Sequence, residues 1–141
     1  MQIKENVGIL IKKIHDELTK NIDNELRDKD LTSSQMNVLV LLNEVPTKKL
    51  SLKEVEKALH VAQPTAAGIV TRLEQKKFIE SFGDTADKRI KMIKITEHGV
   101  KICKESKENM TNIEDMLLES LDNQEREELY RLLSKVKNNL K

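Results

Sequence analysis

The sequence predicts a mainly α-helical (α+β) fold, with six helices and one β-hairpin in a single domain of residues 1–141. A chain of 141 residues has the usual length of one domain. Most apolar residues recur every three or four positions, the helical period, and only residues 78–95 show strand-like runs. With no Trp, one Tyr and two Phe, the core is expected to consist of Leu, Ile and Val.

Helical spacing marks a long first helix over about residues 3–27. Its apolar residues fall on one stripe, formed by Val7, Ile11, Ile14, Leu18, Ile22 and Leu26. Thr32 stands three places before Gln35, the spacing of a capping box in which each side chain accepts a hydrogen bond from a backbone N–H. A second helix begins there, and it ends before Pro46, which lacks the N–H that a helix needs.

Two short helices joined by a turn are expected next. Ser51 and Glu54 repeat the capping-box spacing and open a third helix that ends near Leu59. After the turn at residues 60–62, Pro64 lies in the first turn of a fourth helix, where its missing N–H costs nothing. The buried stripe of this helix consists of Ala66, Ile69, Val70 and Leu73.

Residues 78–95 have the pattern of a two-stranded β-hairpin. Apolar residues at 78–82 and 90–95 flank the turn-forming segment 83–87. Helical spacing returns after Thr96, and Asp122 with Glu125 opens a sixth helix through another capping box. The apolar stripes of these last two helices include Cys103, Met110, Ile113, Leu117, Leu129, Leu132, Leu133 and Val136.

Composition argues against several classes of function. We find no nucleophile motif, phosphate-binding Gly-rich loop or paired-carboxylate motif, so no enzyme, catalytic residue or cofactor is expected. The lone Cys103 and the scattered His15, His60 and His98 favour neither a disulfide nor a metal site. No apolar run reaches the roughly 18 residues of a membrane span, and no signal peptide is evident. We therefore expect a cytoplasmic protein with no membrane partner.

The order of two short helices and then a hairpin is typical of a winged helix-turn-helix. Basic charge is concentrated there, because residues 71–94 carry seven basic and four acidic side chains. A helix fits the major groove of double-stranded DNA, and its N-terminal N–H groups attract phosphate. The alternative is a polar helix surface without a ligand. The residues expected to face DNA from the fourth helix are Gln63, Pro64, Thr65, Gly68, Thr71, Arg72 and Lys76.

Short motifs stand at defined places in these elements. They are Leu31-Thr32 with Gln35, Gln63-Pro64-Thr65, Arg72-Leu73-Glu74, and Asp87-Lys88-Arg89 running to Ile93-Lys94-Ile95-Thr96 with Gly99. Together they resemble the multiple antibiotic resistance regulator (MarR) family, over nearly the whole chain. The chain departs from that family at Ala62 and Ala67, where Ser is common, at Gly68, where Arg is common, and at Lys77, where Gly is usual.

The resemblance implies a homodimeric DNA-binding transcriptional regulator, in most cases a repressor of a near-palindromic operator that a small-molecule effector releases. Residues 1–30 and 97–141 would form the dimer and 31–96 the DNA-binding lobe. Arg89 would enter a minor groove at the wing, with Asp87 orienting it and with Lys88 and Lys91 beside it. A twofold partner would cover the long apolar stripes, through Val7, Ile11, Ile14, Met110, Ile113, Leu117, Leu129, Leu133 and Val136.

Two alternative functions stay open. A winged-helix protein–protein adaptor would keep the fold, but the basic residues of the wing and fourth helix would be dispensable. A redox-sensing regulator would act through Cys103, although a thiol on an apolar stripe is ordinarily buried and inert. For Asp87 and Arg89, the alternative to a role in DNA binding is a surface ion pair.

Overall fold

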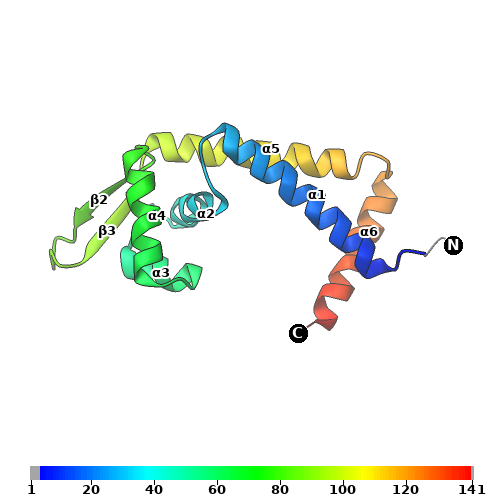
Figure 1. Ribbon diagram of the computed structural model, residues 1–141, viewed down its shortest axis with the longest axis horizontal. Helices are drawn as coiled ribbons and strands as arrows, with labels where there is room; N and C mark the ends of the chain where they lie inside the picture. The colour runs from blue at the N-terminus through cyan, green and yellow to red at the C-terminus, as the bar shows by residue number, and fades with distance from the viewer. Residues whose placement is uncertain (1–3, 141) are drawn as a thin grey trace. The chain divides into compact units, whose positions relative to one another are not determined.

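The computed structural model describes residues 4–140, which form two compact units that divide after Lys107. The first unit contains α1 Val7–Asp28, α2 Ser33–Glu44, β1 Lys49–Ser51, α3 Leu52–Leu59, α4 Gln63–Gln75, β2 Ile79–Gly83, β3 Lys91–Ile95 and the first part of α5 Glu97–Leu117 (Figure 1). The second unit contains the rest of α5 and α6 Asn123–Asn139. The predicted fold class, mainly helical with a winged helix-turn-helix, is confirmed.

Side-chain caps set the beginnings of most helices. All three predicted capping boxes are present, at the starts of α2, α3 and α6. The prediction for α1 was wrong by several residues, since the helix begins at Val7 rather than near residue 3. Its cap is Asn6, whose side chain accepts the backbone N–H of Ile9 at 2.9 Å. Asn at this position ends the extended segment before it and starts the helix.

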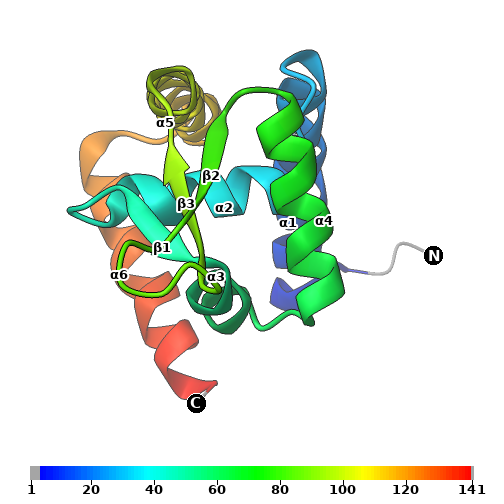
Figure 2. The same ribbon diagram turned by 90° about the vertical axis from the view of Figure 1, so that its left-hand side faces the viewer.

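The sheet has one more strand than the sequence predicted. β1 is only three residues long and pairs antiparallel with β3, where Leu50 lies opposite Ile93. β2 pairs with the other side of β3, which gives the order β1-β3-β2 that Figure 2 shows. The central strand is therefore bonded on both edges, and the β2–β3 hairpin forms the wing.

The core of the first unit lies where α2, α3 and α4 pack on one another and on the sheet. Helix α2 contributes several side chains to this core, among them Val38, Leu39 and Leu42. The largest fully buried side chains are Leu39, Leu42, Leu73, Ile79, Ile93, Val38, Val55 and Val70. Helix α4 presents one buried stripe to this core, so its opposite face is fixed toward solvent.

The wing is joined to α5 by a close contact at Gly99. A Cβ atom on this glycine would lie 2.5 Å from the carbonyl oxygen of Phe78 and 2.6 Å from Cγ1 of Ile95. The hydroxyl of Thr96 donates to backbone carbonyls at the base of β2 and accepts the N–H of Gly99 at 3.1 Å. Only a residue without a side chain allows α5 to begin this close to the strands.

Each unit also carries exposed apolar side chains. In α1, Val7 is 68% exposed and Ile14 is 46% exposed. In the second unit Met110, Leu117, Leu133 and Val136 are exposed, while Ile113 and Leu129 are half-buried. Within residues 4–140, the helices lack the combination of length and apolarity that a bilayer-spanning segment needs.

Candidate nucleic-acid interface

The N-terminal half of α4 presents a polar, open surface. Ala66, Val70 and Leu73 hold the opposite face in the core, which leaves Gln63 and Thr65 exposed. Pro64 lies in the first turn, as predicted. The residue before the helix is Ala62, which makes no side-chain hydrogen bond to the first turn. The leading N–H groups of α4 therefore lack the usual cap and remain available to an anion.

Further along the same face, space is left for a groove to approach closely. Gly68 is exposed, and apart from its chain neighbours and the backbone of its own helix, nothing lies within 4 Å of the position that its Cβ would take. Thr71 is exposed too, although its hydroxyl donates to the carbonyl of Ala67 at 2.8 Å. The guanidinium of Arg72 has no hydrogen-bond or ion-pair partner among the described residues. Arg72 is therefore the cation of this face that can take a phosphate or a guanine without breaking a protein contact.

The turn of the wing holds Arg89 in a defined position. The carboxylate of Asp87 accepts the backbone N–H, the Nε–H and an Nη–H of Arg89, each at 3.0 Å. The side chain of Arg89 is nevertheless 90% exposed. Hydrogen bonds from Arg89 lower the pKa of Asp87, and the same pair raises the pKa of Arg89. Both groups are therefore charged at neutral pH, and the guanidinium is held in place while it remains open to solvent.

Asp84 builds the turn on which this pair stands. Its carboxylate accepts the backbone N–H groups of Ala86 and Asp87, both at 3.2 Å. The hairpin closes through the N–H of Asp84, which donates to the carbonyl of Ile90 at 3.0 Å. The sequence pattern predicts a turn at residues 83–87 but indicates no separate role for Asp84. A short side chain that accepts the N–H two residues on is the signal that identifies it.

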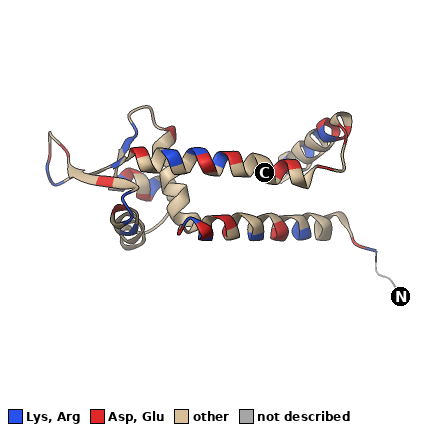
Figure 3. Cartoon of the chain, turned by 90° about the horizontal axis from the view of Figure 1, so that it is seen from above, with Lys and Arg blue, Asp and Glu red and all other residues tan. Residues whose placement is uncertain are grey.

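The other two cations of the wing that were predicted to face DNA differ in exposure. Lys88 is exposed beside Arg89, and Lys91 is half-buried at the start of β3. Figure 3 shows basic residues at the turn of the hairpin and a mixture of both signs along α1 and α5. The seven basic residues counted in 71–94 are thus divided between α4 with the residues just after it and the β2–β3 hairpin.

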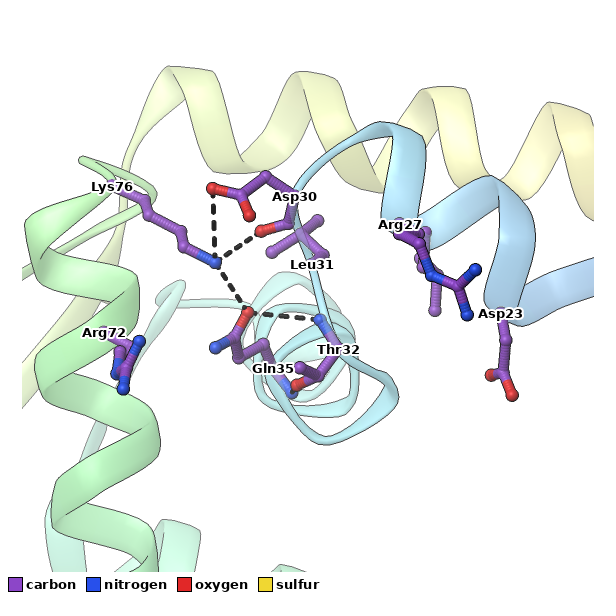
Figure 4. A pocket seen from close by; sticks show the side chains of 9 residues that line it. Asp23, Arg27, Asp30, Leu31, Thr32, Gln35, Arg72 and Lys76 are labelled. Atoms are coloured by element: carbon purple, nitrogen blue, oxygen red, sulfur yellow. Dashed lines mark hydrogen bonds and ion pairs between the residues drawn. The ribbon is translucent and has the colours of Figure 1, made fainter.

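A cavity of about 440 Å³ lies between the α1–α2 turn and α4 (Figure 4). Arg27 and Arg72 contribute guanidinium groups to its wall, and Asp23 and Asp30 contribute carboxylates. Lys76, which the sequence placed among the DNA-facing residues, also lines it. Its ammonium bonds to Asp30 and Gln35, so it is the member of the predicted set that already has several protein partners.

Cys103 is buried in the first part of α5, 7% exposed. Burial raises the pKa of its thiol, and nearby Lys48 opposes that effect more weakly. A thiol in this setting is protonated at neutral pH and is a poor nucleophile. Over the described part of the chain, no three His, Cys, Asp or Glu side chains are grouped as a metal site would require.

Comparison with known proteins matches residues 31–91 to the model of the MarR family. The solved structure of MepR, a transcription regulator of the Staphylococcus aureus multidrug efflux pump MepA, is similar over 97% of this chain and 100% of its own, with 26% identity and a TM-score of 0.88. A MepR–DNA complex from S. aureus matches 96% of this chain and 99% of its own, at 26% identity and a TM-score of 0.71. E. coli MarR without ligand shares the fold, over 96% of this chain and 98% of its own, at 24% identity and a TM-score of 0.76.

Proposed function

This chain carries a MarR-family domain at residues 31–91 and the fold of that family's transcription regulators, and on this premise we propose that it binds operator DNA as a homodimer and represses transcription. The proposal rests mainly on how Arg89 is held and how exposed it is. Three hydrogen bonds hold it at the wing tip, and yet nine-tenths of its side chain faces solvent. A cytoplasmic location belongs to the same proposal, because DNA is the partner.

In this proposal α4 enters the major groove by its N-terminal half. Its uncapped N–H groups attract a phosphate, which positions the helix. Gln63 has the amide geometry that pairs with adenine, and Thr65 suits a phosphate or a thymine methyl group. Gly68, Thr71 and Arg72 continue the same face, and the open space at Gly68 lets the duplex approach the helix backbone. These assignments rest on the exposure of the side chains and on their chemistry.

The wing then reaches the neighbouring minor groove. A minor groove narrowed by A·T base pairs has a strongly negative potential, which favours an inserted guanidinium. Asp87 holds Arg89 before DNA arrives, so less side-chain freedom is lost on binding. Lys88 and Lys91 lie on either side and suit the flanking phosphates.

The homodimer is proposed from the apolar surface that a single chain leaves uncovered. Val7, Ile11 and Ile14 are each more than two-fifths exposed along α1. Met110, Leu117, Leu133 and Val136 are exposed to a similar degree in the second unit. A second copy of the chain would cover these stripes with identical stripes of its own. Twofold symmetry would then set two α4 helices about 34 Å apart, which is one turn of DNA. Residues 1–30 and 97–141 would then serve dimerisation, and 31–96 DNA binding.

A small-molecule effector completes the proposal. The cavity beside α4 has a volume of about 440 Å³, which is within the range of small-ligand sites. It adjoins Arg72, so a bound molecule would act next to the proposed DNA surface. Cys103 offers no comparable basis for redox control, because its thiol is buried and its pKa is raised.

The test is fluorescence anisotropy with a labelled duplex that holds an inverted repeat from the region upstream of the coding sequence. We expect nanomolar binding that weakens steeply with salt, and much weaker binding to a shuffled duplex. Arg89→Ala is expected to weaken binding at least tenfold. Its matched control is Arg131→Ala, which removes an arginine from a similar exposed ion pair in α6. Equal behaviour of the two variants would favour the adaptor function, and the absence of salt-sensitive binding would refute DNA recognition.

A further inference from the structure

Lys76 closes α4 with its side chain directed toward the α1–α2 turn. It is the residue at the C-terminal cap of the helix, and its side chain is 23% exposed. Its ammonium donates to the backbone carbonyl of Asp30 and, at 3.1 Å, to Oε1 of Gln35. The carboxylate of Asp30 lies 3.7 Å away. Figure 4 shows these three interactions converging on one nitrogen from two other elements.

Both partners of Lys76 belong to a part of the lobe with a specific conformation. Gln35 is 7% exposed, and its Oε1 also accepts the backbone N–H of Thr32 at 3.2 Å, as half of the capping box of α2. Asp30 has a φ of 58°, in the left-handed region that few residues other than glycine adopt readily. The backbone carbonyl of Asp30 accepts a hydrogen bond from the ammonium of Lys76. The ammonium of Lys76 thus connects the end of α4 to the start of α2 and to the α1–α2 turn.

We propose that Lys76 is a positioning residue, which aligns α4 for DNA through Asp30 and Gln35 and does not itself contact a phosphate. A phosphate contact would require the ammonium to leave Gln35, whose buried Oε1 would then lose one of its two donors. Arg72, one turn earlier and without a protein partner, needs no such exchange. The proposal rests on the DNA-binding function proposed above and assigns Lys76 a different role in it.

The hydrogen bonds of Lys76 matter for DNA binding because contacts to bases require a precisely placed helix. Hydrogen bonds to bases tolerate displacements of only a few tenths of an ångström, so the helix that carries them needs a fixed support. The core stripe of α4 fixes its distance from α2. Lys76 adds a polar fixed point at the end of the helix, 41 residues along the chain from Gln35. Loss of these hydrogen bonds would let the α4 residues that are proposed to contact bases shift, while the core remained packed.

The experiment measures DNA affinity and its salt dependence for Lys76→Met and for the matched control Lys77→Met, which removes the same charge one residue away. All titrations use the inverted-repeat duplex at several salt concentrations, at a temperature where thermal melting shows each variant fully folded. We expect Lys76→Met to weaken binding at least tenfold with an unchanged slope of log affinity against log salt. Lys77→Met is expected to stay within about threefold of the wild type, since screened charge at the surface has a small effect.

A slope that falls by roughly 0.9 per site in Lys76→Met would identify a phosphate contact and overturn the proposal. Unchanged affinity in Lys76→Met would overturn it as well. If this variant fails to fold, Gln35→Glu replaces it, because Glu preserves the capping box and strengthens the attraction of Lys76. Affinity within threefold of the wild type supports the proposal, and a tenfold loss contradicts it. If the wild type does not bind the duplex, the proposed DNA-binding function is refuted. If the wild type binds, the variants test only the role of Lys76.

Discussion

Two glycines of the first unit show how strongly a single position depends on its surroundings. Gly99 brings α5 against the backbone of Phe78, whereas Gly68 stands on the open face of α4 with free space around it. Gly99 is required by close packing. Gly68 is not, and the absence of a side chain there gives the unfolded chain extra conformational freedom that folding of the helix must remove. The same residue type therefore has opposite consequences for stability at these two places.

We predict that Gly99→Ala destabilises the fold by about 1–3 kcal/mol, because the added Cβ must push aside a backbone carbonyl. Gly68→Ala should instead stabilise it by about 0.5–1 kcal/mol, since Ala restricts the unfolded chain and favours a helix. Chemical denaturation of the two variants and the wild type measures both effects. Changes of the same sign in the two variants would contradict this account of the glycines.

At Cys103 the prediction concerns pH. Burial raises the pKa of the thiol in the folded protein, so the unfolded chain loses this proton at a lower pH. The stabilising contribution is therefore fully present below the pKa of the unfolded thiol, about 8.5, and is lost as the pH rises above it. We expect the wild type to lose more stability than Cys103→Ala between pH 7.5 and 10, as measured by urea denaturation. Parallel losses, or rapid alkylation of the native thiol at pH 7, would show that the thiol is not protected.

Among the elements, the helices begin where local chemistry dictates, and the sequence predicted most of these starting points. Thr32, Ser51 and Asp122 each act on residues three positions away, so the pattern alone was sufficient. The strand β1 was missed because it is three residues long and its partner Ile93 lies 43 residues further along the chain. The partners of Lys76 were missed for the same reason. Contacts between distant segments leave no periodic signal in a single sequence.

The uncapped start of α4 gives a prediction at the element scale. Ala62 has the extended backbone of an N-cap residue but no side-chain oxygen. Ala62→Ser should therefore stabilise the protein by about 1 kcal/mol, through a hydrogen bond to the first turn. Ala58→Ser, inside α3, is the matched control and should be slightly destabilising, because Ser is a poorer helix former than Ala. A destabilised Ala62→Ser variant would mean that the start of α4 differs from the one described.

For the whole molecule, the exposed apolar stripes lead to a prediction about assembly. We expect the 16.2 kDa chain to sediment as a dimer at micromolar concentration. Leu133→Glu should shift it toward the monomer, since a charge would then be buried at the interface. Arg131→Glu, two residues away on the same helix, should leave the dimer intact. A monomeric wild type would remove the basis for two α4 helices reading a near-palindromic site.

In the function that we propose, two wings, one from each copy, insert Arg89 into the DNA. The most direct measurement is the slope of log affinity against log salt for the wild type and for Arg89→Ala on the same inverted repeat. Loss of two charge contacts per dimer should reduce the slope by about 1.8, at roughly 0.9 for each contact. An unchanged slope, with affinity equal to that of the wild type, would show that Arg89 makes no charge contact with the DNA.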